Sequence, residues 1–113
     1  MIKRIVLLSG GICSGKSTLA AALRDKYRFH LIKTHELIGR ALDSPPANRQ
    51  AYQSAGDKLD SSTDGQWIQL QLMRLQSELP DDCSLVVDAV RIQKQIDHIR
   101  DAFGARVFHI HLT

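Results

Sequence analysis

The sequence contains few cysteines. Its 113 residues include only two, Cys13 and Cys83, which lie far apart in the chain and form no metal-binding spacing. Disulfide frameworks in small secreted domains use several cysteine pairs, and structural zinc sites use closely spaced Cys or His residues. We therefore expect two free thiols and neither a disulfide framework nor a structural zinc site.

Long apolar runs are also missing. The run near the N-terminus covers only residues 5–8, with the sequence IVLL. A membrane-spanning helix needs about 20 apolar residues, and a signal peptide needs an apolar region of about 7–15 residues. The sequence therefore predicts no membrane association and a cytoplasmic location.

Aromatic residues are scarce, and basic residues do not cluster. Aromatic side chains make up 5% of the chain, and the net charge is +3. This charge is divided unevenly, because residues 1–56 carry +6 and residues 57–113 carry −3. A nucleic-acid surface would show clustered Lys and Arg interleaved with aromatics, so we expect no nucleic-acid partner and favour a small anionic ligand.

The residues that are present predict one α/β domain over residues 1–113. The content of 43% hydrophobic and 24% charged residues is typical of a globular chain. Short apolar runs predict buried strands, and apolar residues at helical spacing predict helices. The predicted strands are 5–8, 29–33, 85–87 and 107–112, and the predicted helices are 15–26, 37–42, 51–59, 68–79 and 92–103, with a polar turn at 60–65. This alternation predicts a parallel sheet between two layers of helices, with ligands at the carboxyl ends of the strands.

A phosphate-binding motif lies between the first predicted strand and helix. Residues 10–17, GGICSGKS, match G-x-x-x-x-G-K-[ST] at every fixed position. Glycines allow a tight bend that turns backbone N–H groups toward an anion, and the helix adds its positive end. The predicted nucleotide-binding residues are Gly10, Gly11, Ile12, Cys13, Ser14, Gly15, Lys16, Ser17 and Thr18. A dinucleotide-binding motif would need glycine at position 12, and the remaining alternative is a glycine-rich turn with an exposed lysine.

A carboxylate follows the third predicted strand. Asp88 ends the run SLVVD, where a phosphate-loop protein holds Mg²⁺ opposite the hydroxyl that Ser17 supplies here. The alternative is that Asp88 caps the next turn or helix. Arg91 is placed to bind an anionic substrate, or else forms a surface ion pair.

With these motifs the chain resembles the nucleoside and deoxynucleoside monophosphate kinase branch of the P-loop kinases. The resemblance covers residues 3–113 and rests on GGICSGKST, on KTHELIGR at 33–40 and on VDAVR at 87–91. The first motif is specific to P-loop proteins in general, and the other two are weaker. By resemblance, the acceptor-binding residues are Thr34, Arg40, Arg49, Gln53 and Arg91. The alternative for Arg40 and Arg49 is solvated helix charge.

Two parts of such kinases have no counterpart in this sequence. These kinases continue past the fourth strand into a mobile lid and a fifth strand, whereas this sequence stops at Thr113. We expect a piece of a longer protein, with a following domain as one option, and slow turnover by residues 1–113 alone. His109 and His111 share one face of the last predicted strand without a third metal ligand, so packing or solvation at the sheet edge is the expected role.

Two classes of function fit the sequence. In the first, ATP transfers its γ-phosphoryl group to a nucleoside monophosphate or a similar small phosphate-bearing acceptor, with Mg²⁺ as cofactor and Lys16, Asp88 and Arg91 as catalytic residues. In the second, nucleotide binding regulates an attached or separate protein without turnover. GTP is less favoured than ATP because no Asn-Lys-x-Asp motif is present. Kinases for shikimate, gluconate or dephospho-coenzyme A remain open.

Overall fold

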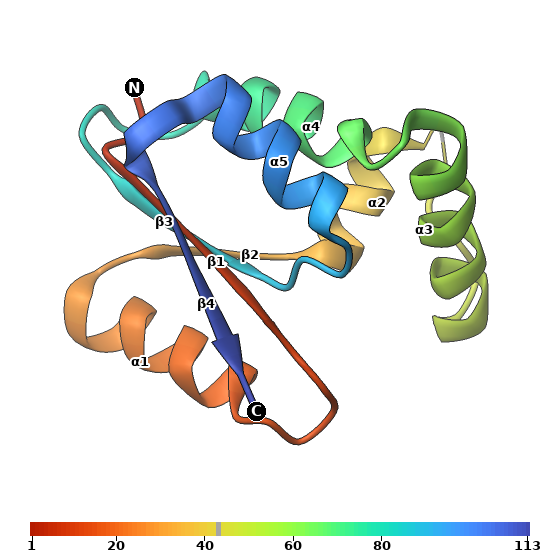
Figure 1. The fold of residues 1–113 in the computed structure, drawn as a ribbon, viewed down its shortest axis with the longest axis horizontal. Coiled ribbons are helices and arrows are strands. Elements are labelled where there is room, and N and C mark those ends of the chain that lie inside the picture. The colour runs from red at the N-terminus through yellow and green to blue at the C-terminus, as the bar shows by residue number, and fades with distance from the viewer. Residues whose placement is uncertain (43) are drawn as a thin grey trace.

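The computed structural model describes residues 1–42 and 44–113 as alternating strands and helices (Figure 1). Short β-branched runs form the strands, and amphipathic stretches form the helices, as predicted. The elements are β1 (Arg4–Gly10), α1 (Lys16–Tyr27), β2 (His30–Lys33), α2 (Thr34–Ala41), α3 (Arg49–Thr63), α4 (Gln66–Gln76), β3 (Ser84–Asp88), α5 (Gln93–Phe103), the 3₁₀ turn η1 (Gly104–Arg106) and β4 (Val107–Leu112).

The four strands form one parallel sheet in the order β2-β3-β1-β4. The predicted α/β class with parallel strands is confirmed. Leu8 of β1 lies beside Asp88 of β3 on one side and Ile110 of β4 on the other. Because all strands run the same way, their carboxyl ends meet at one edge of the sheet, where α/β proteins bind ligands.

Helices cover both faces of the sheet. On one face, α1 packs over a small cluster that contains Val6, Leu8, Ala20 and Val86. The larger cluster lies on the other face, where α2, α4 and α5 contribute its helical residues and α3 packs at the side against α2 and α4 (Figure 1). Side chains along β1 alternate between the two faces of the sheet, so Ile5 and Leu7 both pack in the larger cluster.

The structure corrects the expected turn at residues 60–65. The helix α3 continues through Thr63, and the chain reverses only at Asp64 and Gly65, which have φ angles of 53° and 81°. The polar side chains that predicted a turn instead bind the next helix: Asp60 accepts a hydrogen bond from the indole of Trp67, and Thr63 accepts one from the Trp67 amide. A run of polar residues can continue a helix when its side chains form hydrogen bonds with residues of another element.

Most other boundaries differ from the sequence-based ranges by one to three residues, and α2 begins at Thr34, before the predicted start at 37. The strand β1 extends to Gly10, since Ser9 and Gly10 pair with His111 and Leu112 of β4. The helix α4 ends at Gln76, before the predicted limit of 79.

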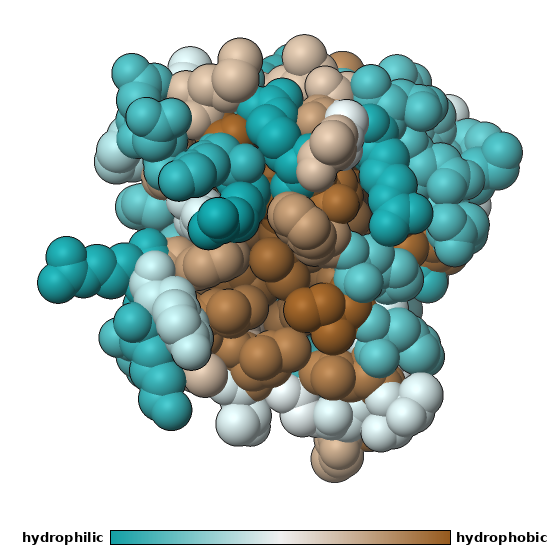
Figure 2. All heavy atoms as spheres, turned by 60° about the vertical axis from the view of Figure 1, so that its left-hand side comes forward, coloured by the Kyte–Doolittle hydropathy of each residue, from teal (hydrophilic) through white to brown (hydrophobic). Residues whose placement is uncertain are grey.

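The surface is uneven in polarity. Apolar side chains gather in one patch on the face that Figure 2 brings forward, with hydrophilic residues around it. Two of the large apolar side chains that remain exposed, Phe108 and Ile110, come from β4 at the edge of the sheet. In the part of the chain that the structure describes, no helix has both the length and the apolar character needed to cross a membrane.

Two leucines of α4 test how far the larger cluster stabilises the fold. Leu72 is fully buried, whereas Leu70 on the same helix is 46% exposed. We expect Leu72→Ala to lower the free energy of unfolding by about 2–5 kcal/mol because it leaves a cavity in the core. Leu70→Ala is the matched control and should cost less than about 1 kcal/mol. Urea denaturation measures both, and equal losses would contradict this description of the core.

Candidate functional site

The segment between β1 and α1 bends sharply, as the phosphate-binding motif predicts. Gly10, Cys13 and Gly15 all have positive φ angles, of 137°, 64° and 93°. A Cβ atom on Gly10 would lie 2.2 Å from the backbone oxygen of Leu112, so glycine is required there by both conformation and space. The bend therefore depends on the close approach of β4 to the end of β1.

A hollow lies inside this bend. Residues 12–18 line a cavity of about 420 Å³, and the side chain of Ile12 is 90% exposed. The N-cap Gly15 provides no side-chain hydrogen bond to the first turn of α1, and no acidic residue lies in that turn. Free N–H groups and the positive end of a helix favour an anion at this position.

The side chain of Lys16 contacts the first residues of the loop. Its Nζ donates hydrogen bonds to the backbone oxygens of Gly10 and Gly11, at 2.6 and 2.8 Å. Within residues 1–42 and 44–113 no carboxylate pairs with this ammonium group. Its charge is therefore balanced only by carbonyl dipoles, which a phosphate group can replace.

The two residues predicted to hold Mg²⁺ lie side by side. The hydroxyl of Ser17, in the first turn of α1, donates to Oδ2 of Asp88, at the end of β3, over 3.4 Å. In the described residues no three His, Cys, Asp or Glu side chains are grouped to hold a metal ion. Two hard oxygen ligands from separate elements fit Mg²⁺, which completes its shell with water and substrate phosphates.

Two larger cavities share two lining residues, and the first of these cavities borders the loop. The first, of about 630 Å³, is lined by Gly10 and Lys16 of the loop and by residues of β4 and the β3–α5 connection. The second, of about 530 Å³, lies between α2 and α3 and includes Arg49 and Gln53. Thr34 and Arg91 line both cavities. The structure thus brings four of the five predicted acceptor-binding residues to adjoining spaces.

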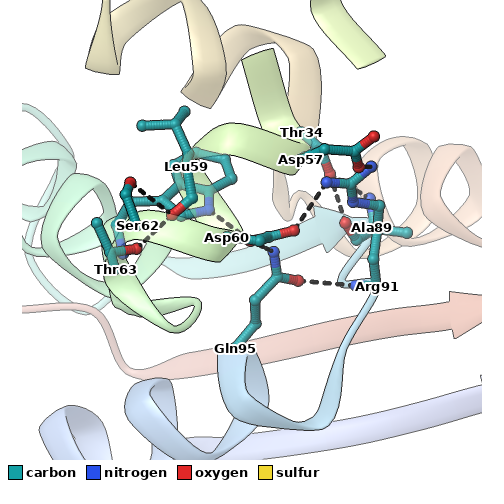
Figure 3. A network of polar contacts seen from close by, with 10 residues as sticks. Thr34, Asp57, Leu59, Asp60, Ser62, Thr63, Ala89, Arg91 and Gln95 are labelled. Atoms are coloured by element: carbon teal, nitrogen blue, oxygen red, sulfur yellow. Dashed lines mark hydrogen bonds and ion pairs between the residues drawn. The ribbon is translucent and has the colours of Figure 1, made fainter. Parts of the chain in front are cut away.

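A largely enclosed carboxylate, that of Asp60, holds Arg91 in place (Figure 3). Oδ2 of Asp60 accepts a hydrogen bond from Nη2 of Arg91 at 2.7 Å, and Oδ1 accepts from Trp67 Nε1 and Gln95 Nε2 at 2.7 and 2.8 Å. Gln95 is fully buried and also accepts from the Arg91 backbone N–H. Asp57 adds an exposed contact of 3.3 Å to the same guanidinium. Arg91 therefore forms an ion pair, and its guanidinium also borders both cavities.

Space for the guanidinium comes from Gly56 on α3. A Cβ atom at this position would lie 2.9 Å from Arg91 Nη2 and 3.2 Å from Ile38 Cδ1. Sequence reasoning did not identify Asp60 or Gln95, since Asp60 was assigned to a turn. A signal was present in the helical spacing of Asp57 and Asp60, which places both acids on one face of α3.

Thr34 links α2 to the end of β3. Its hydroxyl accepts a hydrogen bond from the Ala89 N–H at 2.8 Å and donates one to the Ala89 carbonyl oxygen. The hydroxyl is therefore committed to the backbone, and Thr34 shapes the boundary between the two cavities. His35 and Tyr52 contact each other edge to face in the second cavity, with ring centroids 5.8 Å apart.

Arg40 is not brought to this group. Its guanidinium makes two hydrogen bonds to Glu78, at 2.7 and 3.1 Å, and it lines neither of the two cavities. The pairing raises the pKa of Arg40 and lowers the pKa of Glu78, in both cases mainly through the side-chain hydrogen bond. The structure therefore favours the surface alternative for Arg40, since α2 directs it toward the segment after α4.

Two side chains of the loop, those of Cys13 and Ser14, differ in their exposure. Cys13 is an exposed free thiol at the bend, and Ser14 Oγ is buried without a hydrogen-bond partner in the described part of the chain. His109 and His111 both contact Ser9 and line the first cavity. His111 is exposed on the edge strand β4, as expected for solvation at the sheet edge, and His109 is half-buried.

Comparisons with known proteins add no assignment. No protein-family model matches the chain, and no curated protein matches it. The functional argument therefore rests on the residues and the geometry of the site.

Two aspartates of α3 test the anchoring of Arg91. The side chain of Asp60 is 12% exposed, whereas that of Asp57 is 63% exposed. We expect Asp60→Asn to lower the free energy of unfolding by about 1.5–3 kcal/mol, because an amide cannot accept from all three donors. Asp57→Asn removes a solvated contact and should cost less than about 1 kcal/mol. The two values come from chemical denaturation, and a smaller loss for Asp60→Asn than for Asp57→Asn would refute the anchoring role.

Proposed function

We propose that the protein transfers the γ-phosphoryl group of ATP to a nucleoside monophosphate or a similar small phosphate-bearing acceptor. The observation that carries this proposal is the pair of adjoining cavities that share Thr34 and Arg91. One cavity borders the phosphate loop, and the other is lined by Arg49 and Gln53. A transfer reaction needs two substrates that meet end to end, which this arrangement accommodates.

Each element of the site has a role in this proposal. The bend of residues 10–17 binds the polyphosphate through backbone N–H groups, and Lys16 exchanges its carbonyl partners for phosphate oxygens. Ser17 and Asp88 would hold Mg²⁺, which when bound neutralises charge on the phosphates. Arg91 binds the acceptor phosphate and aligns it for transfer.

A regulatory module that only binds nucleotide would need the loop but no acceptor cavity. The second cavity and the anchored arginine at its border favour transfer over regulation. The alternative predicts that nucleoside monophosphates neither bind nor turn over.

Nucleotide binding is tested first, through the loop lysine. We expect Mg·ATP to raise the melting temperature, since a ligand at 100 times its Kd adds about 2.7 kcal/mol to stability. Lys16→Ala should weaken ATP binding about 10–100-fold, because a charge-assisted contact of about 1.5–3 kcal/mol is lost. Lys26→Ala, at the exposed end of the same helix, is the control and should keep the full response. The proposal fails if wild-type protein shows no response to Mg·ATP.

The acceptor site is tested through Arg91. A panel of nucleoside and deoxynucleoside monophosphates is screened for a rise in melting temperature and for production of ADP from Mg·ATP. We expect Arg91→Gln to abolish the response to the best acceptor and to lower transfer by about 10³-fold, while the response to Mg·ATP remains. Arg24→Ala removes a paired but exposed arginine on α1 and should change neither. Unaltered acceptor binding in Arg91→Gln would disprove the assigned role, and a wild type that binds no acceptor would favour the regulatory alternative.

A further inference from the structure

A serine and two histidines form a hydrogen-bonded cluster beside the phosphate loop. Oγ of Ser9 lies 2.6 Å from Nε2 of His109 and 2.8 Å from Nδ1 of His111. The register of β1 and β4 creates this contact, because Ser9 is paired with His111. All three residues line the first cavity, together with Lys16 and Arg91.

The number of protons in this cluster decides what it can bind. When both imidazoles are neutral, one ring N–H donates to Oγ of Ser9, and the Ser9 hydroxyl donates to the bare nitrogen of the other ring. Every group at the contact is then satisfied within the cluster. When that second ring gains a proton, both rings donate to Oγ, and the Ser9 hydroxyl hydrogen is released to point elsewhere. Protonation therefore adds a positive charge and frees one hydrogen-bond donor, and an anion can use both.

The surroundings of His109 disfavour a proton on this ring. Burial, together with the positive charges of Arg100 on α5 and of the neighbouring His111, lowers the pKa of His109, and burial has the largest effect. Across the cavity the charged groups are Lys16 from α1 and Arg91 from the β3–α5 connection, which are also positive. Among the described residues that line this cavity there is no Asp or Glu. A phosphate chain in this cavity would add a negative charge that favours an imidazolium.

We propose that Ser9, His109 and His111 form a proton-accepting contact for phosphate groups in the first cavity, so that binding of a polyphosphate is accompanied by uptake of a proton by this cluster. The inference rests on the proposed binding of a polyphosphate at the loop, and it adds a proton to that step. It assigns a function to three side chains that the phosphate-binding motif does not include.

Proton uptake gives binding a definite dependence on pH. The bound state holds more protons than the free state between the lower pKa of the free cluster and the higher pKa of the bound one. Affinity is therefore greatest below this window and falls as the pH rises through it, by at most about tenfold per pH unit for one proton.

Calorimetry measures the proton directly. Mg·ATP and, separately, inorganic tripolyphosphate are titrated into the protein at pH 7 in buffers with different ionisation enthalpies. The variation of the observed heat with buffer enthalpy gives the number of protons taken up. We expect uptake of a substantial fraction of one proton per ligand by wild-type protein, and almost none by the double variant His109→Gln/His111→Gln.

The variants are chosen to keep the contact and remove only the proton. Glutamine can both donate to and accept from Ser9 but does not titrate near neutral pH. His30→Gln replaces an exposed histidine on β2 and should show the wild-type uptake, which controls for the loss of a histidine outside the cluster, while the double variant shows any protons exchanged by the ligand itself. Melting temperatures without ligand establish that each variant is folded. If the double variant is unfolded, the imidazole proton shifts of wild-type protein, followed by NMR with and without tripolyphosphate, give the same answer.

The outcomes separate this inference from the proposed function. Binding with uptake that the double variant loses supports both. Binding of Mg·ATP with no uptake, or with equal uptake in the double variant, overturns the role of the cluster and leaves phosphate binding intact. Failure of both Mg·ATP and tripolyphosphate to bind overturns both.

Discussion

The candidate site depends on the parallel register of β1 with the strands on its two sides. This register places Leu8 beside Asp88, and it brings the backbone of Leu112 so close to Gly10 that no side chain fits between them. A shift of one residue would reverse the face of every side chain on β1 and would separate Ser9 from His111. Apolar residues along β1 and β3 stabilise this register, because both strands are buried in the sheet. The core thus fixes the relative positions of groups that contribute little to stability themselves.

Much of the fold could be predicted from the sequence because its signals are local. Short β-branched runs and helical spacing identified every strand and helix, and the alternation of the two gave a parallel sheet. The bend at residues 10–17 was predicted from glycines whose positive φ angles the structure contains at Gly10 and Gly15. The adjacency of Ser17 and Asp88 was expected from the way in which phosphate-loop proteins hold Mg²⁺.

The rest of the site depends on contacts between distant segments, which a sequence pattern does not record. Asp60 lies 31 residues before Arg91, and its polar neighbours were read as a turn although Trp67 and Gln95 use its carboxylate. Arg40 follows the pattern of an acceptor-binding residue, yet the orientation of α2 directs it to Glu78. In both cases the contact that forms depends on the direction in which a helix face points, and sequence spacing does not determine this direction.

The two aspartates beside Arg91 differ in how easily they can leave it. Asp60 is held by three donors and is almost enclosed, whereas Asp57 is largely in water. In the proposed reaction, the acceptor phosphate can therefore displace Asp57 while Asp60 stays bound to Arg91. The phosphate then takes the place of the Asp57 carboxylate beside the Arg91 guanidinium. This exchange requires only that the exposed side chain of Asp57 rotates away. Arg91 thus has one permanent counter-ion and one replaceable counter-ion, and the backbone of α3 need not move when they are exchanged.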